Sequence, residues 1–166
     1  MFKKVDPRSL SFNVFSAIGD QWMLVTAGTA DSCNTMTASW GGLGILWNKP
    51  MATAYIRPQR YTKEFMDAQE YFTLAFFPEE YRQKLALCGT KSGRDMDKVS
   101  ECGFTVCTGE GGAPYFAEAE LVLVCRKRMV MPMDPAAVPV DEDQRHYDND
   151  HHYMYWGEIV EALTKA

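Results

Sequence analysis

The sequence is poor in histidine, with only three, and all of them lie near the C-terminus, at positions 146, 151 and 152. A Ser/His/Asp triad therefore cannot be argued from this chain. Its five cysteines include no CxxC pair, so we expect reduced thiols of a cytoplasmic protein. No N-terminal apolar run indicates a signal peptide, and no stretch of about 18 apolar residues predicts a membrane span.

Positive charge is also in short supply. Seventeen Lys and Arg stand against 22 Asp and Glu, which gives a formal net charge of −5. This balance argues against a general nucleic-acid binder, although a local basic patch is compatible with it. The glycines of GGLG at 41–44 lack the GxGxxG spacing, and no βαβ unit surrounds them, which argues against a Rossmann dinucleotide site.

Apolar and aromatic residues are plentiful, at 46% and 13% of the chain. This is enough for a full core, and we expect a single domain over residues 1–166. The patterns predict strands at 21–28, 34–41, 51–57, 71–77, 104–108, 117–131 and 151–163, the last with a bulge at Gly157. Many strands and few short helices predict a mainly β protein, a closed or nearly closed barrel with a few short peripheral helices.

Three short helices have terminal signals in the sequence. Thr62 is predicted to cap the first, Pro78 to open the second and Gly89 to end it. Ser92 is predicted to begin the third, with Asp95 at capping-box spacing.

Residues 132–150 are proline-rich and acidic, and we expect a surface excursion within the same domain. The adjoining segment gathers residue types that can ligate metals, but no recognised metal spacing joins them. We therefore expect an exposed polar loop and no metal site at His146, Asp148, Asp150, His151 and His152.

The stretch NTMTASWGG, 34–42, places three hydroxyls on one face of a strand and apolar side chains on the other. The hydroxyls belong to Thr35, Thr37 and Ser39. Gly41, Gly42 and Gly44 then leave bare backbone. The pattern suits a strand that offers small polar groups to a ligand, although threonine is also simply a good strand former.

Two basic turns lie at 56–62, IRPQRYT, and at 89–98, GTKSGRDMDK. Each leads into a predicted helix start, and helix N-termini with nearby Arg or Lys attract anions. The second turn lacks the order of a P-loop. Both turns are equally compatible with capped surface helices that bind nothing.

Taken in order, these segments together with EYFTLAFF and the closing YWGEIVEAL resemble the flavin reductase family with an FMN-binding split-barrel fold, which includes flavoredoxin-like proteins. The resemblance covers nearly the whole chain. It implies a homodimer of small Greek-key split barrels, with FMN near the subunit interface. The cofactor-binding residues that it implies are Met36, Thr37, Ala38, Ser39, Trp40, Arg57, Arg60, Tyr61, Thr62, Lys91, Ser92, Gly93 and Arg94.

The implied activity is a flavin reductase that passes electrons from NADH or NADPH through FMN to a flavin or another acceptor. No catalytic protein residue is expected, because the flavin carries the chemistry. Tyr153, Tyr155 and Trp156 are candidates for shaping the ring face, or else for core or interface packing. The alternatives are an electron carrier reduced by a partner protein at the acidic stretch 141–150, and a flavin-storage protein.

Overall fold

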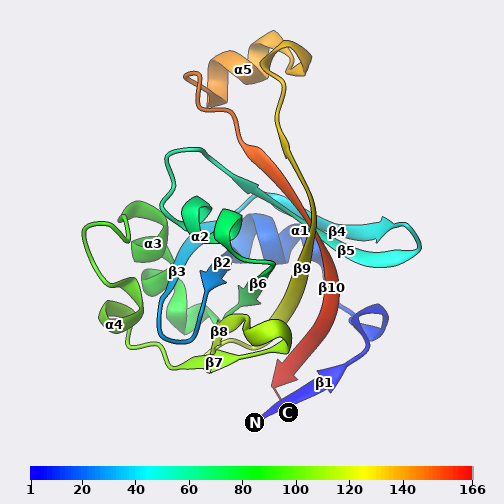
Figure 1. Cartoon of the computed structure of the whole chain (residues 1–166), viewed down its shortest axis with the longest axis vertical. Coiled ribbons are helices and arrows are strands. Elements are labelled where there is room, and N and C mark those ends of the chain that lie inside the picture. The colour runs from blue at the N-terminus through cyan, green and yellow to red at the C-terminus, as the bar shows by residue number, and fades with distance from the viewer. Residues whose placement is uncertain (166) are drawn as a thin grey trace.

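The computed structural model describes residues 1–165, and it is mainly β, as predicted, with the split-barrel fold (Figure 1). Seven strands follow one another through hydrogen bonding in the order β3-β2-β6-β9-β10-β5-β4, and β1 pairs with β10 to complete an eight-stranded sheet. Every pairing is antiparallel. The strands are β1 (Phe2–Val5), β2 (Met23–Gly28), β3 (Cys33–Ala38), β4 (Gly41–Leu46), β5 (Lys49–Ile56), β6 (Tyr71–Phe76), β9 (Leu121–Pro132) and β10 (Tyr153–Lys165).

Short helices and one small hairpin surround this sheet. The α-helices are α1 (Val14–Ser16), α2 (Thr62–Ala68), α3 (Arg82–Thr90), α4 (Lys98–Cys102) and α5 (Val140–His146). Single turns of 3₁₀ or π helix lie at Pro7–Ser9, Ala17–Gln21, Glu79–Tyr81, Glu110–Gly112 and Pro135–Ala137. The hairpin of β7 (Val106–Thr108) and β8 (Pro114–Phe116) forms a separate two-stranded sheet.

The long strands β9 and β10 bend the sheet around its core. The predicted bulge is confirmed, because the β9–β10 register shifts between Trp156 and Gly157. A Cβ at Gly157 would lie 2.7 Å from both Cys125 Cβ and Phe72 Cζ, so the position needs glycine.

Apolar side chains lie on both faces of the sheet. All six residues of β2 are buried, since α2 covers one face and α3 and β8 cover the other. One cluster fills the barrel around Met23, Phe72 and Tyr155. The second lies between the outer face and the α3–α4 side, around Leu85, Phe104 and Phe116.

The predicted strand 34–41 is divided in the structure. β3 ends at Ala38, and the glycines of 41–44 belong to β4, which forms a hairpin with β5. Its turn residues Trp47 and Asn48 have φ values of 52° and 57°, as a two-residue hairpin turn requires. Sequence analysis did not predict β1, β4 or β8.

The helix boundaries correct three predictions. Thr62 is the first residue of α2 rather than its cap, and its hydroxyl accepts from Asn34 Nδ2 at 2.8 Å. Gly89 lies inside α3, which continues to Thr90. No helix begins at Ser92, because α4 begins at Lys98 and its cap is Asp97, whose carboxylate accepts from the N–H groups of Val99 and Ser100.

The excursion is confirmed. Residues 133–152, with α5, project from the end of β9 and return to β10, at the top of Figure 1. Among residues 1–165, no helix has the length and apolar composition needed to cross a membrane.

Candidate functional site

A narrow cavity of about 230 Å³ lies where β3 ends beside β5 and the base of the excursion. Seven of the residues expected from the sequence line it, together with Tyr55 and His152. The seven are Met36, Thr37, Ala38, Ser39, Trp40, Arg57 and Arg60.

A second cavity, of about 120 Å³, lies next to the first and shares Arg60 with it. Here the two basic turns meet, although they are separated by some 30 residues in the chain. Its lining consists of Gln59, Arg60, Tyr61, Thr62, Thr90, Lys91, Ser92, Gly93 and Lys98. The structure thus brings together every expected residue except Arg94.

Arg60 lines both cavities, and backbone carbonyls of α3 fix its guanidinium. Its Nη1 donates to Gly89 O at 2.8 Å and its Nη2 to Cys88 O at 3.4 Å, both at the C-terminal end of α3. A cation at this end of a helix is favourable, because the free carbonyls carry partial negative charge. Burial lowers the pKa of Arg60, and within residues 1–165 no carboxylate forms an ion pair with it.

The turn at 91–94 is shaped by close packing rather than by a helix start. Ser92 Oγ accepts from the Arg94 N–H at 3.1 Å. A Cβ at Gly93 would lie 2.0 Å from Asn34 Oδ1 and 2.9 Å from Tyr61 Cδ1, so this turn approaches β3 closely only because position 93 is glycine. The turn therefore stays near Arg60 without the predicted helix.

Arg94 and Arg57 have other partners. Arg94 pairs with the Glu64 carboxylate, donates to Gln59 O at 3.2 Å and lines neither cavity. Arg57 lines the larger of the two, but its guanidinium donates to Asp150 Oδ2 at 2.6 Å and to His146 O at 3.0 Å. These bonds fasten the excursion to the barrel.

Two of the three hydroxyls of the β3 face are already used inside the protein. Thr35 Oγ1 bonds Thr26 Oγ1 at 2.9 Å in the buried sheet, and Thr37 Oγ1 donates to Leu85 O of α3. Among residues 1–165, the Ser39 hydroxyl has no hydrogen-bonding partner. Of the three, Ser39 is therefore the one whose hydroxyl is available to a ligand.

His152 is a site residue that sequence analysis missed. It was expected in an exposed loop, yet its side chain is 7% exposed and lines the 230 Å³ cavity. The Tyr147 hydroxyl bonds its Nδ1 at 2.9 Å, and the Trp40 ring centroid lies 5.3 Å from its own. Burial lowers the pKa of His152 to about 4, so the imidazole is neutral at pH 7. Its place as the second residue of the predicted strand 151–163 was the available signal, because one of two adjacent residues in a half-buried strand faces inward.

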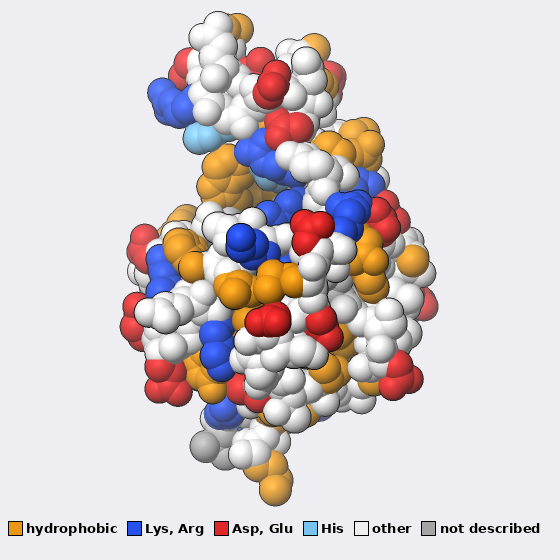
Figure 2. Space-filling model, turned by 90° about the vertical axis from the view of Figure 1, so that its left-hand side faces the viewer, with side chains coloured by type: hydrophobic (Ala, Val, Ile, Leu, Met, Phe, Trp, Pro, Cys, Tyr) orange, Lys and Arg blue, Asp and Glu red, His pale blue; other side chains and the backbone are white. Residues whose placement is uncertain are grey.

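Two larger, mainly apolar hollows, of about 610 and 750 Å³, meet at Trp40. The first runs between α1 and the start of β4, and the second lies under the excursion, where Met131, Pro139 and Tyr147 line it. Figure 2 shows the notch between excursion and body, with hydrophobic and basic side chains on its walls. A Cβ at Gly42 would meet nothing within 4 Å, so this part of the backbone is open to a ligand.

Gly41 is required by packing, and the aromatic side chains of β10 do not shape these cavities. A Cβ at Gly41 would lie 2.8 Å from both Met23 Cε and Thr53 O, so this glycine is required by packing. Tyr155 is fully buried and its hydroxyl donates to Asp67 Oδ1 at 2.5 Å, which makes it a core residue. Neither Tyr153 nor Trp156 lines these cavities.

Solved structures with the same fold include three instructive relatives. Flavoredoxin from Methanosarcina acetivorans is 25% identical over 87% of this chain and 68% of that chain, with a TM-score of 0.70. An FMN-binding domain of a flavin reductases-like enzyme from Shewanella baltica is 19% identical over 99% and 77%, with a TM-score of 0.70. A Streptomyces globisporus NADH:FAD oxidoreductase is 16% identical over 87% and 74%, with a TM-score of 0.65.

No curated protein sequence matches the chain. A family model matches residues 15–165. This range includes the residues that line both cavities and the excursion between β9 and β10. The chain therefore belongs to the family described by the flavin reductase like domain.

Proposed function

We propose that this protein binds FMN and acts as an NADH- or NADPH-dependent flavin reductase. The observation that carries the proposal is that Arg60 lines two adjacent cavities, a small basic one and the one beneath residues 36–40. FMN has the matching shape, with a dianionic phosphate at one end and a flat ring at the other. The residues present therefore fit the group.

At the phosphate end, the suitable donors are Arg60, Lys91, the Ser92 hydroxyl and the backbone of Gly93. At the ring end, Trp40, Tyr55 and the uncharged His152 supply flat or apolar surface, and the Ser39 hydroxyl supplies a polar contact. Gly42 leaves room beside them. When bound, FMN supplies the redox chemistry of the reaction, by taking electrons from a reduced nicotinamide and passing them to an acceptor.

The protein's own contribution is to bind and orient the flavin and to shape what approaches it. Arg57 holds the excursion over this end of the barrel, and His152 stays neutral against Trp40. A second solved structure of the Streptomyces enzyme is a complex with NAD and FAD fragments. That relative supports a nicotinamide donor for this chain.

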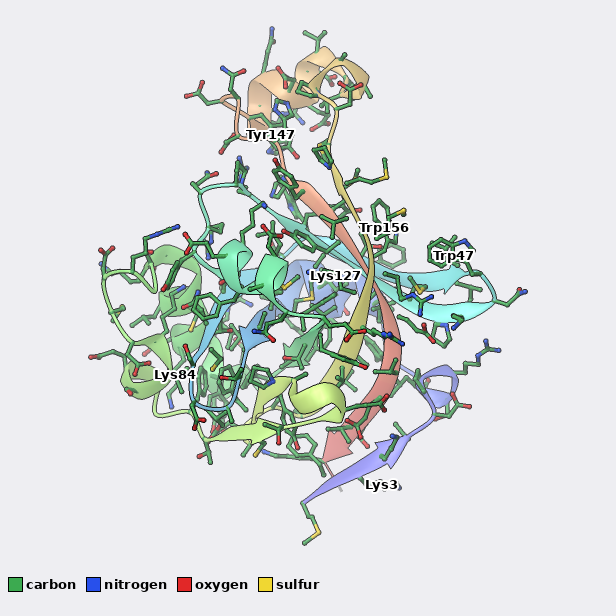
Figure 3. The ribbon with its side chains drawn as sticks, in the orientation of Figure 1. Lys3, Trp47, Lys84, Lys127, Tyr147 and Trp156 are labelled. Carbon is green, nitrogen blue, oxygen red and sulfur yellow. The ribbon has the colours of Figure 1, made fainter. Side chains whose placement is uncertain are left out.

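We further propose that the protein is a homodimer. The β4–β5 hairpin extends away from the sheet and carries Ile45 and Trp47, which are 64% and 55% exposed (Figure 3). Phe15 and Met131 are exposed as well, at 90% and 45%. Exposed apolar side chains that are grouped, as Ile45 and Trp47 are on one hairpin, are typical of surfaces that a partner covers.

A second candidate is an electron carrier that a partner protein reduces. Two observations favour it: the relative at 25% identity is a flavoredoxin, and Asp141, Glu142 and Asp143 form an acidic first turn of α5 at the tip of the excursion. A basic redox partner would recognise such a tip.

Anaerobic addition of NADH or NADPH to the FMN-loaded protein distinguishes the two candidates. If the protein is a reductase, the absorbance of oxidised FMN is expected to fall after addition of NADH or NADPH. This loss should be as fast as catalytic turnover. Protein that holds FMN but stays oxidised with both donors would support the carrier and contradict the reductase.

A further inference from the structure

Two buried thiols lie in direct contact on the side of the molecule where α3 and α4 pack together (Figure 1). Cys88 Sγ is 3.7 Å from Cys102 Sγ, and the two residues are 0% and 3% exposed. Among residues 1–165, no other two thiols lie this close. Cys88 and Cys102 therefore form a pair, whereas the cysteines at 33, 107 and 125 are single thiols.

Hydrogen bonds to the backbone keep these two sulfurs near each other. Lys98 is the first residue of α4, is only 3% exposed, and its Nζ donates to Cys88 O at 2.8 Å. Arg60 Nη2 donates to the same carbonyl at 3.4 Å. Lys98 and Cys102 are four residues apart on α4, so their side chains lie on one face of that helix, the face that meets Cys88. The end of α3 is therefore held against α4 at the thiol contact.

The chain between the two cysteines contains the second basic turn. Residues 91–97 form neither helix nor strand, and Lys91 and Arg94 are exposed. A covalent bond between Cys88 and Cys102 would enclose this segment in a loop. Because a closed loop gains fewer conformations when it opens, the bond would make local unfolding of the turn less favourable.

Formation of this bond needs only a small movement. The two sulfurs of a disulfide are about 2.0 Å apart, so Cys102 Sγ must approach Cys88 Sγ by roughly 1.7 Å. α4 has only five residues, and so short a helix opens locally at little cost. Burial raises the pKa of both thiols, that of Cys88 to about 12, so the pair is expected to react when such an opening admits an oxidant.

We propose that Cys88 and Cys102 are a redox pair, which a peroxide converts into an intramolecular disulfide that encloses the second basic turn. The inference goes beyond the proposed function and does not depend on it, because neither step involves the flavin. It assigns a modification site to two residues that line no cavity described above.

The reaction has two steps and consumes one hydrogen peroxide. The thiolate of Cys102 first attacks the peroxide, so that an S–O bond forms, the O–O bond breaks and one water leaves. The sulfur of Cys88 then attacks the resulting sulfenic acid, so that an S–S bond forms, the S–O bond breaks and a second water leaves. Two electrons pass from the sulfurs to the peroxide, and both thiol protons end in water.

The experiment treats the folded wild-type protein with hydrogen peroxide and then unfolds it in N-ethylmaleimide, which blocks every remaining thiol. Trypsin cuts after Lys91 and Lys98 and chymotrypsin after Phe104, so Cys88 and Cys102 fall on separate peptides with one cysteine each. Mass spectrometry is expected to find these two peptides joined, in a chain that runs as a monomer on a denaturing gel. Cys102→Ser should abolish the joined peptides, and the control Cys107→Ser should keep them.

Limited proteolysis of the folded protein tests the effect on the turn. Trypsin cleavage after Lys91 and Arg94 is expected to be slower by about tenfold or more after oxidation, and dithiothreitol should restore the original rate. In Cys102→Ser the peroxide should leave this rate unchanged.

Two results would overturn the redox pair in the wild-type protein itself, whether or not Cys102→Ser folds. One is that Cys88 and Cys102 both carry N-ethylmaleimide after oxidation. The other is that either of them is joined to Cys33 or Cys107 instead. Joined peptides without slower cleavage after Lys91 and Arg94 would overturn the effect proposed for the turn.

Discussion

Arg57 Nη1 lies 2.6 Å from Asp150 Oδ2, across 93 residues of chain, and this contact joins the excursion to the cavity at the end of β3. Gln59 Nε2 donates to the same carboxylate oxygen at 2.9 Å, and the Asp148 N–H donates to its other oxygen. One carboxylate therefore fixes three groups. The stability of the excursion and the shape of the proposed flavin site are linked through it.

Replacing this carboxylate is expected to release the excursion. In Asp150→Ala the Arg57 guanidinium loses its charged partner, which is expected to destabilise the protein by about 1–3 kcal/mol. Urea unfolding measures the loss, and limited proteolysis is expected to cut within 133–152 faster. Asp148→Ala is the matched control, because its side chain makes no hydrogen bond within residues 1–165. Equal protease resistance of both variants and the wild type would contradict this role.

Acid is expected to destabilise the protein through His152. Burial lowers its pKa from 6.5 to about 4, so between these values the unfolded chain binds more protons than the folded one. The free energy of unfolding should therefore fall as the pH decreases from 6.5 to 4. The charged groups that act on His152 are Arg57, Asp150 and His151. Thermal melts across this range are expected to show a smaller decrease in His152→Gln than in the control His146→Gln. Parallel curves would disprove the assignment.

Alkaline pH is expected to weaken FMN binding at the proposed site through Lys98. The pKa of Lys98 is about 8 in the free protein, and a bound phosphate must raise it. Binding above pH 8 therefore takes up a proton, and the affinity for FMN should fall by up to about tenfold per pH unit. The thiol of Cys88, which also faces Lys98, keeps a pKa raised to about 12 and stays neutral in this range.

The lowered pKa of Lys98 also predicts an effect on the free energy of unfolding of the protein without flavin. Unfolded lysine has a pKa of 10.5, so between pH 8 and 10.5 the unfolded chain again binds more protons. Deprotonation of Lys98 should stabilise the free protein while it weakens FMN binding. Fluorescence titrations with FMN and riboflavin, together with melts of the free protein from pH 7 to 9, test both signs. An FMN affinity independent of pH would contradict the account.

Gly93 is expected to tolerate no side chain. A methyl group there would overlap Asn34 Oδ1, which lies 2.0 Å from its ideal position, and would push the turn away from Arg60. Gly93→Ala should therefore lower both the melting temperature and the affinity for FMN. Gly42→Ala is the control for folding, because its methyl group would meet nothing within 4 Å. A Gly93→Ala variant with wild-type stability and affinity would refute the packing argument.

Local chemistry made most of the fold predictable. The alternation of apolar and polar residues, together with the positions of proline and glycine, predicted the strands 71–77 and 151–163, the Gly157 bulge and the excursion. The division of 34–41 was not predictable in this way, because residues 39–41 read as a continuation of the strand. The hairpin depends on left-handed backbone at Trp47 and Asn48, and tryptophan is not a usual signal for that conformation.

The site was predictable as a set of segments but not in its contacts. The basic turns were identified, and the structure places them on one cavity. Which hydroxyls and guanidiniums remain available depends on tertiary partners: Leu85 for Thr37, Asp150 for Arg57 and Glu64 for Arg94. Lys98 and His152 were missed because burial of a polar side chain is decided by packing between distant segments.

The most direct test of the flavin site is a fluorescence titration of purified wild-type protein and Arg60→Ala with FMN. The account predicts saturable binding by the wild type at one FMN per chain, and binding roughly 10- to 150-fold weaker in Arg60→Ala, since a charge-assisted contact at the junction of the two cavities is lost. Absence of FMN binding by the folded wild-type protein would contradict the account, and an unchanged dissociation constant in Arg60→Ala would show that this side chain does not hold the flavin.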